Sequence, residues 1–128
     1  MPRRNLILAI LLAVVCGCTP RLNDEKTLTD VDFNGKDLIV PSIRKERKVN
    51  IVAAASGSKV DVYVFLEANK DAAEKEILNK KFGANVLAHQ LSVESATLNP
   101  TIPAGQNAIV RVAASGLKKA TVKVSLTD

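Results

Sequence analysis

Alternating apolar and polar positions along the second half of the chain predict β-strands. In the segment 120–126 every second residue is apolar, namely Ala120, Val122, Val124 and Leu126. The strand period of two puts these side chains on one buried face and leaves the other face to solvent. Similar short runs occupy residues 37–40, 48–55, 60–66, 86–91, 93–102 and 107–112, with Gly, Ser and Pro between several of them. Such a series predicts an all-β fold, an antiparallel β-sandwich of about seven or eight strands.

Two segments interrupt this rhythm. Residues 69–82 are rich in Ala, Glu and Lys, which predicts one short inserted helix across an end of the sandwich. Asp71 and Glu74 have capping-box spacing, and Gly83 is a plausible C-terminal stop. Pro100 cannot donate to a ladder, so the stretch around it should be broken or lie at a sheet edge.

The N-terminal segment has a different pattern. A basic start is followed by ten apolar residues from 6 to 15. This run is shorter than the roughly 20 residues that span a bilayer, so it predicts a cleaved signal rather than a membrane helix. Val15, Cys16, Gly17 and Cys18 then resemble the lipobox of bacterial lipoproteins.

The lipobox resemblance implies that residues 1–17 are removed and that Cys18 is acylated, with palmitate-like chains as a membrane anchor. It places the protein in the cell envelope, facing the periplasm or the surface. Thr19, rather than Asp, after the cysteine favours the outer membrane. The alternative is an ordinary secreted protein. Residues 18–35 are mostly polar and predict the lipidated N-terminus and a tether, with the β-sandwich domain over 36–128.

Charge and cysteine content narrow the possible partners. The net charge is +5, but Arg3 and Arg4 leave with the signal, so the mature chain has 16 basic and 13 acidic side chains, or +3. The chain has no Trp and few other aromatic residues, which together with export argues against nucleic acid as a partner. Both cysteines, Cys16 and Cys18, lie at the signal boundary, so the domain cannot depend on an internal disulfide.

Asp30, Asp32 and Asn34, followed by Gly35, resemble the start of a calcium-binding loop. Pro41 stands where that loop needs its bidentate glutamate, so an ordinary turn is the alternative. We expect no metal ion and no cofactor, with these three residues as the only calcium candidates.

The densest basic cluster consists of Arg44, Lys45, Arg47 and Lys48. These side chains could contact polyanionic sugars or acidic lipid headgroups. The alternative is a solvated loop that prevents edge-to-edge strand pairing.

The sequence shows no catalytic constellation. His89 is the only histidine, and no Gly-x-Ser-x-Gly motif occurs. His89 falls within a predicted strand, where a structural role is expected. We therefore expect a protein that is not an enzyme.

Two segments share a pattern of strand, Ala-Ser-Gly turn and strand, at residues 51–62 and 110–124. Both predict hairpins, either from an internal duplication or because two hairpins share the same turn chemistry.

The domain also resembles the bacterial pre-peptidase C-terminal domain, a β-sandwich family. Asp61 and Tyr63 match its Asp-x-Tyr pattern on an early strand, and Pro103-Ala104-Gly105 matches its late turn. The segment 69–83 departs from that family's usual short loop. The resemblance implies a non-catalytic accessory module, and no site residue can be carried across.

The sequence therefore predicts an envelope-anchored lipoprotein with a non-catalytic binding or structural module, whose partner is an unknown envelope protein or polysaccharide. The alternatives are a small hydrolase or hydrolase subunit, and a calcium-stabilised adhesion module.

Overall fold

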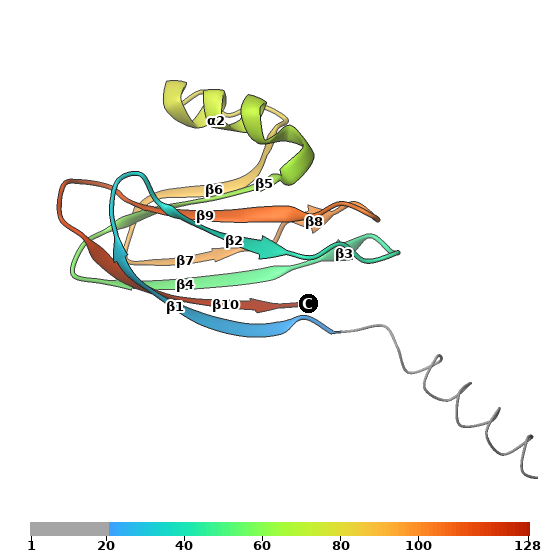
Figure 1. Ribbon diagram of the computed structural model, residues 1–128, viewed down its shortest axis with the longest axis horizontal. Helices are drawn as coiled ribbons and strands as arrows, with labels where there is room; N and C mark the ends of the chain where they lie inside the picture. The colour runs from blue at the N-terminus through green and yellow to red at the C-terminus, as the bar shows by residue number, and fades with distance from the viewer. Residues whose placement is uncertain (1–20) are drawn as a thin grey trace, which may run out of the picture.

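The computed structural model describes residues 21–128, which form two stacked four-stranded sheets and a two-stranded pair (Figure 1). All strand pairs are antiparallel, which confirms the predicted β-sandwich. The first sheet has the order β1-β10-β4-β7, the second β2-β9-β5-β6, and the pair is β3-β8. The elements are β1 (Asn23–Val31), β2 (Lys36–Val40), β3 (Arg47–Lys48), β4 (Asn50–Ser56), β5 (Val60–Leu66), a 3₁₀ turn (Glu67–Asn69), α2 (Lys70–Asn79), β6 (Val86–Val93), β7 (Ser95–Leu98), β8 (Thr101–Ile102), β9 (Ala108–Ala114) and β10 (Ala120–Thr127).

Small aliphatic side chains from both sheets fill the core between them. The fully buried members include Ile51 of β4, Val62 of β5, Val110 of β9 and Val124 of β10. On β10 the buried and exposed positions alternate as the sequence predicts. Burial of these side chains, at roughly 25 cal/mol per Å² of apolar surface, provides the main stabilisation of the fold.

The Ala-Ser-Gly turns do not close hairpins, so that prediction was wrong. β4 and β5 belong to different sheets, as do β9 and β10, and each turn carries the chain from one sheet to the other. The two bends lie side by side, because β4 pairs with β10, β5 pairs with β9, and Ser115 N–H donates to the Lys59 carbonyl at 3.0 Å. Alternation along a strand identifies its buried face but not its partner, and so the sequence pattern suited a hairpin and an inter-sheet bend equally well.

The prediction of a tether through residue 35 was wrong for most of that segment. Residues 23–31 form β1, which pairs along β10 at the edge of the first sheet. Most of its side chains are exposed, so backbone hydrogen bonds hold it rather than a buried face. The folded domain therefore begins at about residue 22, where Leu22 N–H donates to Asp128 Oδ1 at 3.0 Å.

The predicted helix is present, but its ends and its position differ from the prediction. It starts after Asn69 without a side-chain cap, and it ends at Lys80, which takes the left-handed conformation at φ 53°. Gly83 N–H is instead bound by the Glu76 carboxylate at 2.6 Å.

α2 covers the outer face of the second sheet instead of lying across an end (Figure 1). Ala73 and Ile77 pack there against Tyr63 and Phe65 in a second apolar cluster. This explains why β5 is buried on both faces. No helix within residues 21–128 is long and apolar enough to cross a membrane.

Pro100 interrupts the predicted strand 93–102, as expected. β7 ends at Leu98 and lies at the edge of the first sheet, and β8 resumes at Thr101. The Pro100 carbonyl accepts the N–H of Val49 at 3.0 Å, which joins this break to the chain between β3 and β4.

Candidate functional site

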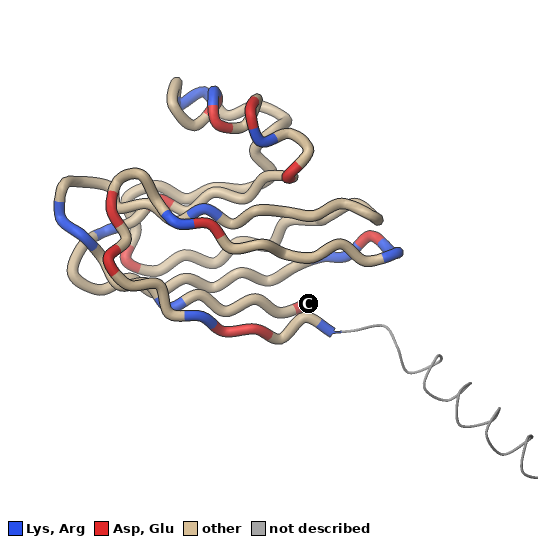
Figure 2. Tube along the Cα trace, in the orientation of Figure 1, with Lys and Arg blue, Asp and Glu red and all other residues tan. Residues whose placement is uncertain are grey.

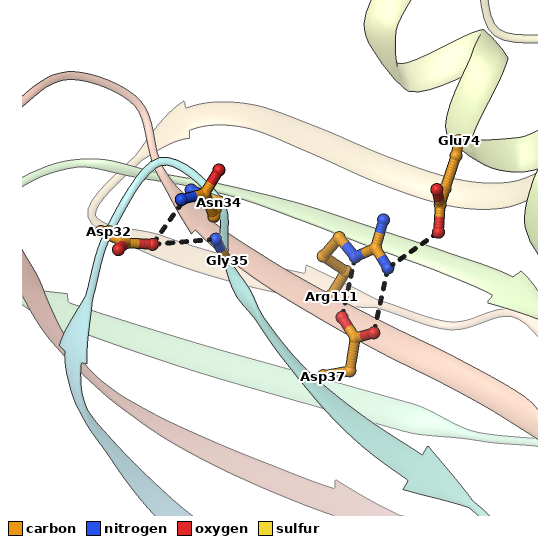
Figure 3. Close-up of polar contacts among 6 residues, drawn as sticks. All are labelled: Asp32, Asn34, Gly35, Asp37, Glu74 and Arg111. Atoms are coloured by element: carbon orange, nitrogen blue, oxygen red, sulfur yellow. Dashed lines mark hydrogen bonds and ion pairs between the residues drawn. The ribbon is translucent and has the colours of Figure 1, made fainter.

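Two of the calcium candidates, Asp32 and Asn34, lie in the connection between β1 and β2 (Figure 3), and the third, Asp30, lies near the end of β1. Asp32 Oδ1 accepts the N–H groups of Asn34 at 3.0 Å and Gly35 at 3.3 Å, so its carboxylate caps the turn. Asp30 has a left-handed backbone, φ 52°, where β1 carries one extra residue opposite β10. No group of three or more His, Cys, Asp or Glu side chains within residues 21–128 is placed to hold a metal ion. The arrangement is that of an Asx turn beside a bulge.

The basic cluster spans the end of the sandwich, from the β2–β3 connection into β3. Arg47 is not available to a ligand, because its Nη2 donates to the Pro41 carbonyl at 2.6 Å and its Nη1 pairs with Asp128 at 3.5 Å. Its side chain is only 9% exposed. Arg44, Lys45 and Lys48 are exposed, so three of the four predicted contact residues remain on the surface.

The Asp-x-Tyr pair has a structural role. Asp61 Oδ2 accepts the Tyr63 hydroxyl at 3.3 Å, while its Oδ1 accepts Ser92 N–H at 2.8 Å and the Ser115 hydroxyl at 2.9 Å. Ser92 has φ 53°, at a point where β6 carries one extra residue opposite β5. The buried carboxylate thus caps a β-bulge. Burial, followed by the charge and hydrogen bond of Asp61, raises the pKa of Tyr63 to about 12.

An ion-pair network that the sequence did not reveal joins α2 to the sheet beneath it (Figure 3). Arg111 of β9 donates to both carboxylate oxygens of Asp37 on β2, at 2.8 and 3.0 Å, and to Glu74 of α2 at 3.3 Å. Its guanidinium also lies 5.2 Å from the centre of the Phe65 ring. The hydrogen bond to Asp37 is the largest factor that raises the pKa of Arg111.

This network corrects the predicted capping box. Glu74 binds Arg111, and no side chain caps the N-terminus of α2. The sequence contained no signal for the network, because it depends on the strand register that places Asp37 directly opposite Arg111.

His89 has the structural position expected of it. Its exposed ring lies on β6 and stacks on Phe82, with 3.9 Å between the ring centres.

An open pocket at the β4–β5 bend is lined by residues 55–59 and Glu94, and His89 is not among its lining residues.

Glu76 organises the chain after α2. Its carboxylate accepts Gly83 N–H and the Asn85 side-chain amide, each at 2.6 Å. The hydrogen bond from Gly83 is the largest influence on the pKa of Glu76 and lowers it.

Cys18, the predicted lipidation site, and the predicted signal 1–17 lie outside the described residues.

Comparison with solved structures supports the fold. The chain is similar to the pre-peptidase C-terminal domain of a collagenase from Bacillus anthracis, with a TM-score of 0.51 and 14% identity over 83% of this chain and 90% of that one. This likeness shows a shared β-sandwich architecture, in agreement with the resemblance seen in the sequence.

Two further structures overlap less well. The CBM6 domain of the laminarinase LamC from Zobellia galactanivorans has a TM-score of 0.42 and 11% identity over 80% of this chain and 87% of that one. The nucleoplasmin-like domain of Drosophila FKBP39 has a TM-score of 0.42 and 14% identity over 86% and 92%. No family profile and no curated protein matches the chain.

Proposed function

We propose that this chain is a lipoprotein of the bacterial cell envelope, anchored through acyl chains on Cys18. Its β-sandwich would act as a non-catalytic binding or structural accessory module. The observation that carries the proposal is the position of the lipobox cysteine, five residues ahead of the first strand of a folded sandwich. A lipid there would display the whole domain from a membrane surface.

The arrangement of polar groups within residues 21–128 supports an accessory role. Asp61, Arg111 and Glu76 each bind other parts of the same domain and stabilise it. The likeness to the pre-peptidase C-terminal domain of a collagenase concerns the fold, and it agrees with the sequence resemblance that implies a non-catalytic accessory module. The partner would be another envelope protein or a polysaccharide, and Thr19 favours the outer membrane.

Replacement of Cys18 tests the anchor. The Cys18→Ser chain, expressed with its own signal in a bacterium, should lose the acyl chains that mass spectrometry detects on the native protein. It should also keep an unprocessed leader, because lipoprotein signals are cleaved at the modified cysteine.

Cys16→Ser is the matched control. This position leaves with the signal under the proposal, so the variant should be acylated and processed like the native chain. An intact leader and an unmodified Cys18 thiol in native material would refute the proposal. If the anchor is confirmed, crosslinking in intact cells would identify the partner.

A further inference from the structure

Basic side chains gather at the end of the sandwich where the described chain begins. Asp128 ties this end together, because its two carboxylate oxygens bind Leu22 N–H and the Arg47 guanidinium. The segment 41–48 therefore lies beside the start of β1. In Figure 2 the blue segments of this end lie at the tip next to β3 and at the start of the coloured tube.

Four exposed cations define what we call the basic end: Arg21, Arg44, Lys45 and Lys48. The exposed acidic residues in the same segments are Asp24, Glu25 and Glu46, and Asp128 lies beside them. Glu25 pairs with Lys123 and Asp128 with Arg47, so the four exposed cations outnumber the remaining carboxylates of Asp24 and Glu46. Arg47 contributes indirectly, since its bonds to Pro41 and Asp128 hold the basic segment in place.

The short connection between Cys18 and β1 places the basic end close to the predicted anchor. Only residues 19–22 separate Cys18 from β1, and the five residue steps from 18 to 23 reach at most about 18 Å when fully extended. Electrostatic attraction acts over a Debye length of about 8–10 Å at physiological salt. A chain this short holds the basic end near the headgroups, whereas the bend after β9 lies a further 27 Å or so along the eight residues of β10.

We propose that the basic end rests on anionic phospholipid headgroups of the membrane that holds the anchor, and so orients the sandwich with its opposite bends facing away. This inference rests on the proposed function, since it needs the lipid at Cys18. Charge complementarity and the short connection favour lipid over soluble polyanions. Each cation near an anionic surface raises the ratio of domains that rest on the membrane to domains that do not roughly fivefold.

Energy transfer in vesicles tests the orientation. The acylated protein would be purified from bacterial membranes and reconstituted into phosphatidylcholine vesicles with or without phosphatidylglycerol. Lipidation blocks the Cys18 sulfur and Cys16 leaves with the signal, so one introduced cysteine can carry a donor dye. Ala104→Cys labels the basic end, because its loop is bonded to the basic segment through Gly105 N–H and the Ile43 carbonyl at 2.8 Å. Leu117→Cys, 94% exposed, labels the opposite end.

We expect transfer from position 104 to a headgroup acceptor to increase when phosphatidylglycerol is present and to return to the neutral-vesicle level in high salt. Transfer from position 117 should decrease as the domain becomes oriented. R44E/K45E/K48E should abolish the lipid dependence. The control K59E/K118E/K119E makes the same change in charge at exposed positions of the opposite end, and it should preserve the lipid dependence.

Several outcomes would overturn the inference. One is transfer at position 104 that is independent of anionic lipid and of salt, and another is an equal effect of the two triple variants. Salt-sensitive binding of a soluble polyanionic polysaccharide by Arg44, Lys45 and Lys48, without a lipid response, would assign the basic end to sugars instead. Mass spectrometry distinguishes these outcomes from failure of the proposed function. A native chain without acyl groups refutes both the lipid anchor and the orientation. An acylated chain whose energy transfer does not depend on anionic lipid refutes only the orientation.

Discussion

Replacing Asp61 with asparagine removes the only charge bound to the Tyr63 hydroxyl while keeping an oxygen at the same position. The asparagine carbonyl can still accept Ser92 N–H, so the β-bulge of β6 should persist. Tyr63 is the only tyrosine and the chain has no tryptophan, so tyrosinate absorbance reports this one side chain.

The expected change in the Tyr63 pKa on Asp61→Asn follows from the causes that raise this pKa in the native chain. Burial is the largest cause of the rise from 10.0 to about 12, and the Asp61 charge and hydrogen bond add to it. Asp61→Asn should therefore lower the pKa of Tyr63 but leave it above 10.0, because burial is unchanged.

The raised pKa also makes stability depend on pH. Between pH 10 and 12 the folded chain binds its phenolic proton more tightly than the unfolded chain, so this contribution is complete below pH 10 and is lost as pH rises toward 12. Two pH units correspond to about 2.7 kcal/mol for a group fully excluded from water. Water near the exposed Ser115 reduces the expected loss to about 1–2 kcal/mol.

A spectrophotometric titration, with circular dichroism to show that the domain is still folded, measures the pKa. Urea unfolding at several alkaline pH values measures the stability, and Tyr63→Phe is the control that should remove this part of the pH dependence. A native Tyr63 that titrates near 10 while folded would refute the reasoning, as would an unchanged pKa in Asp61→Asn.

Three further outcomes are expected. Arg111→Met should reduce the free energy of unfolding, measured in urea, by about 1–3 kcal/mol, because it breaks a network within a packed surface. The control Lys123→Met removes an exposed ion pair and should change the free energy of unfolding by less than about 0.5 kcal/mol. Equal effects of the two variants would contradict the expectation that the Arg111 network contributes more. Gly35→Ala should destabilise by about 1–3 kcal/mol, since its backbone has φ 83° and a Cβ would lie 3.0 Å from the Val112 carbonyl, whereas Gly105→Ala, with open space around it, should lose only about 1 kcal/mol. Calcium should leave the melting temperature unchanged, because the Asp32 carboxylate already caps its turn; an increase that EDTA reverses would restore the calcium hypothesis.

The sequence predicted the strands whose side chains alternate clearly between core and solvent. β10 was located closely, because burial of one face there imposes a period of two on apolar residues. β5 was located closely because its run of apolar residues suits a strand that is buried on both faces. β1 was missed because an edge strand held by its ladder needs no buried face, and its sequence is mostly polar. Strand pairing was also hidden, which is why the two inter-sheet bends were predicted as hairpins.

The candidate site residues were predicted less completely. The basic segment was recognised from its composition, but its position beside the start of β1 depends on Asp128, more than 80 residues from Arg44 in the chain. The Asp-x-Tyr motif was noted as a pattern, while its role depends on a bulge in a different strand. Long-range contacts of this kind leave no local periodicity in a sequence.

The pairing of β1 with β10 has a mechanical consequence for a protein held by its N-terminus. Tension between the chain ahead of residue 23 and a load at the opposite end of the sandwich acts along the strand axis and shears the ladder, so its hydrogen bonds share the force instead of opening one after another. We expect single-molecule stretching between residue 23 and residue 117, at the opposite end, to require a higher rupture force than stretching between residue 23 and residue 128, which peels β1 from β10 starting at the Asn23–Thr127 pair. A strand with almost no buried side chains would then be the part of the domain that withstands traction.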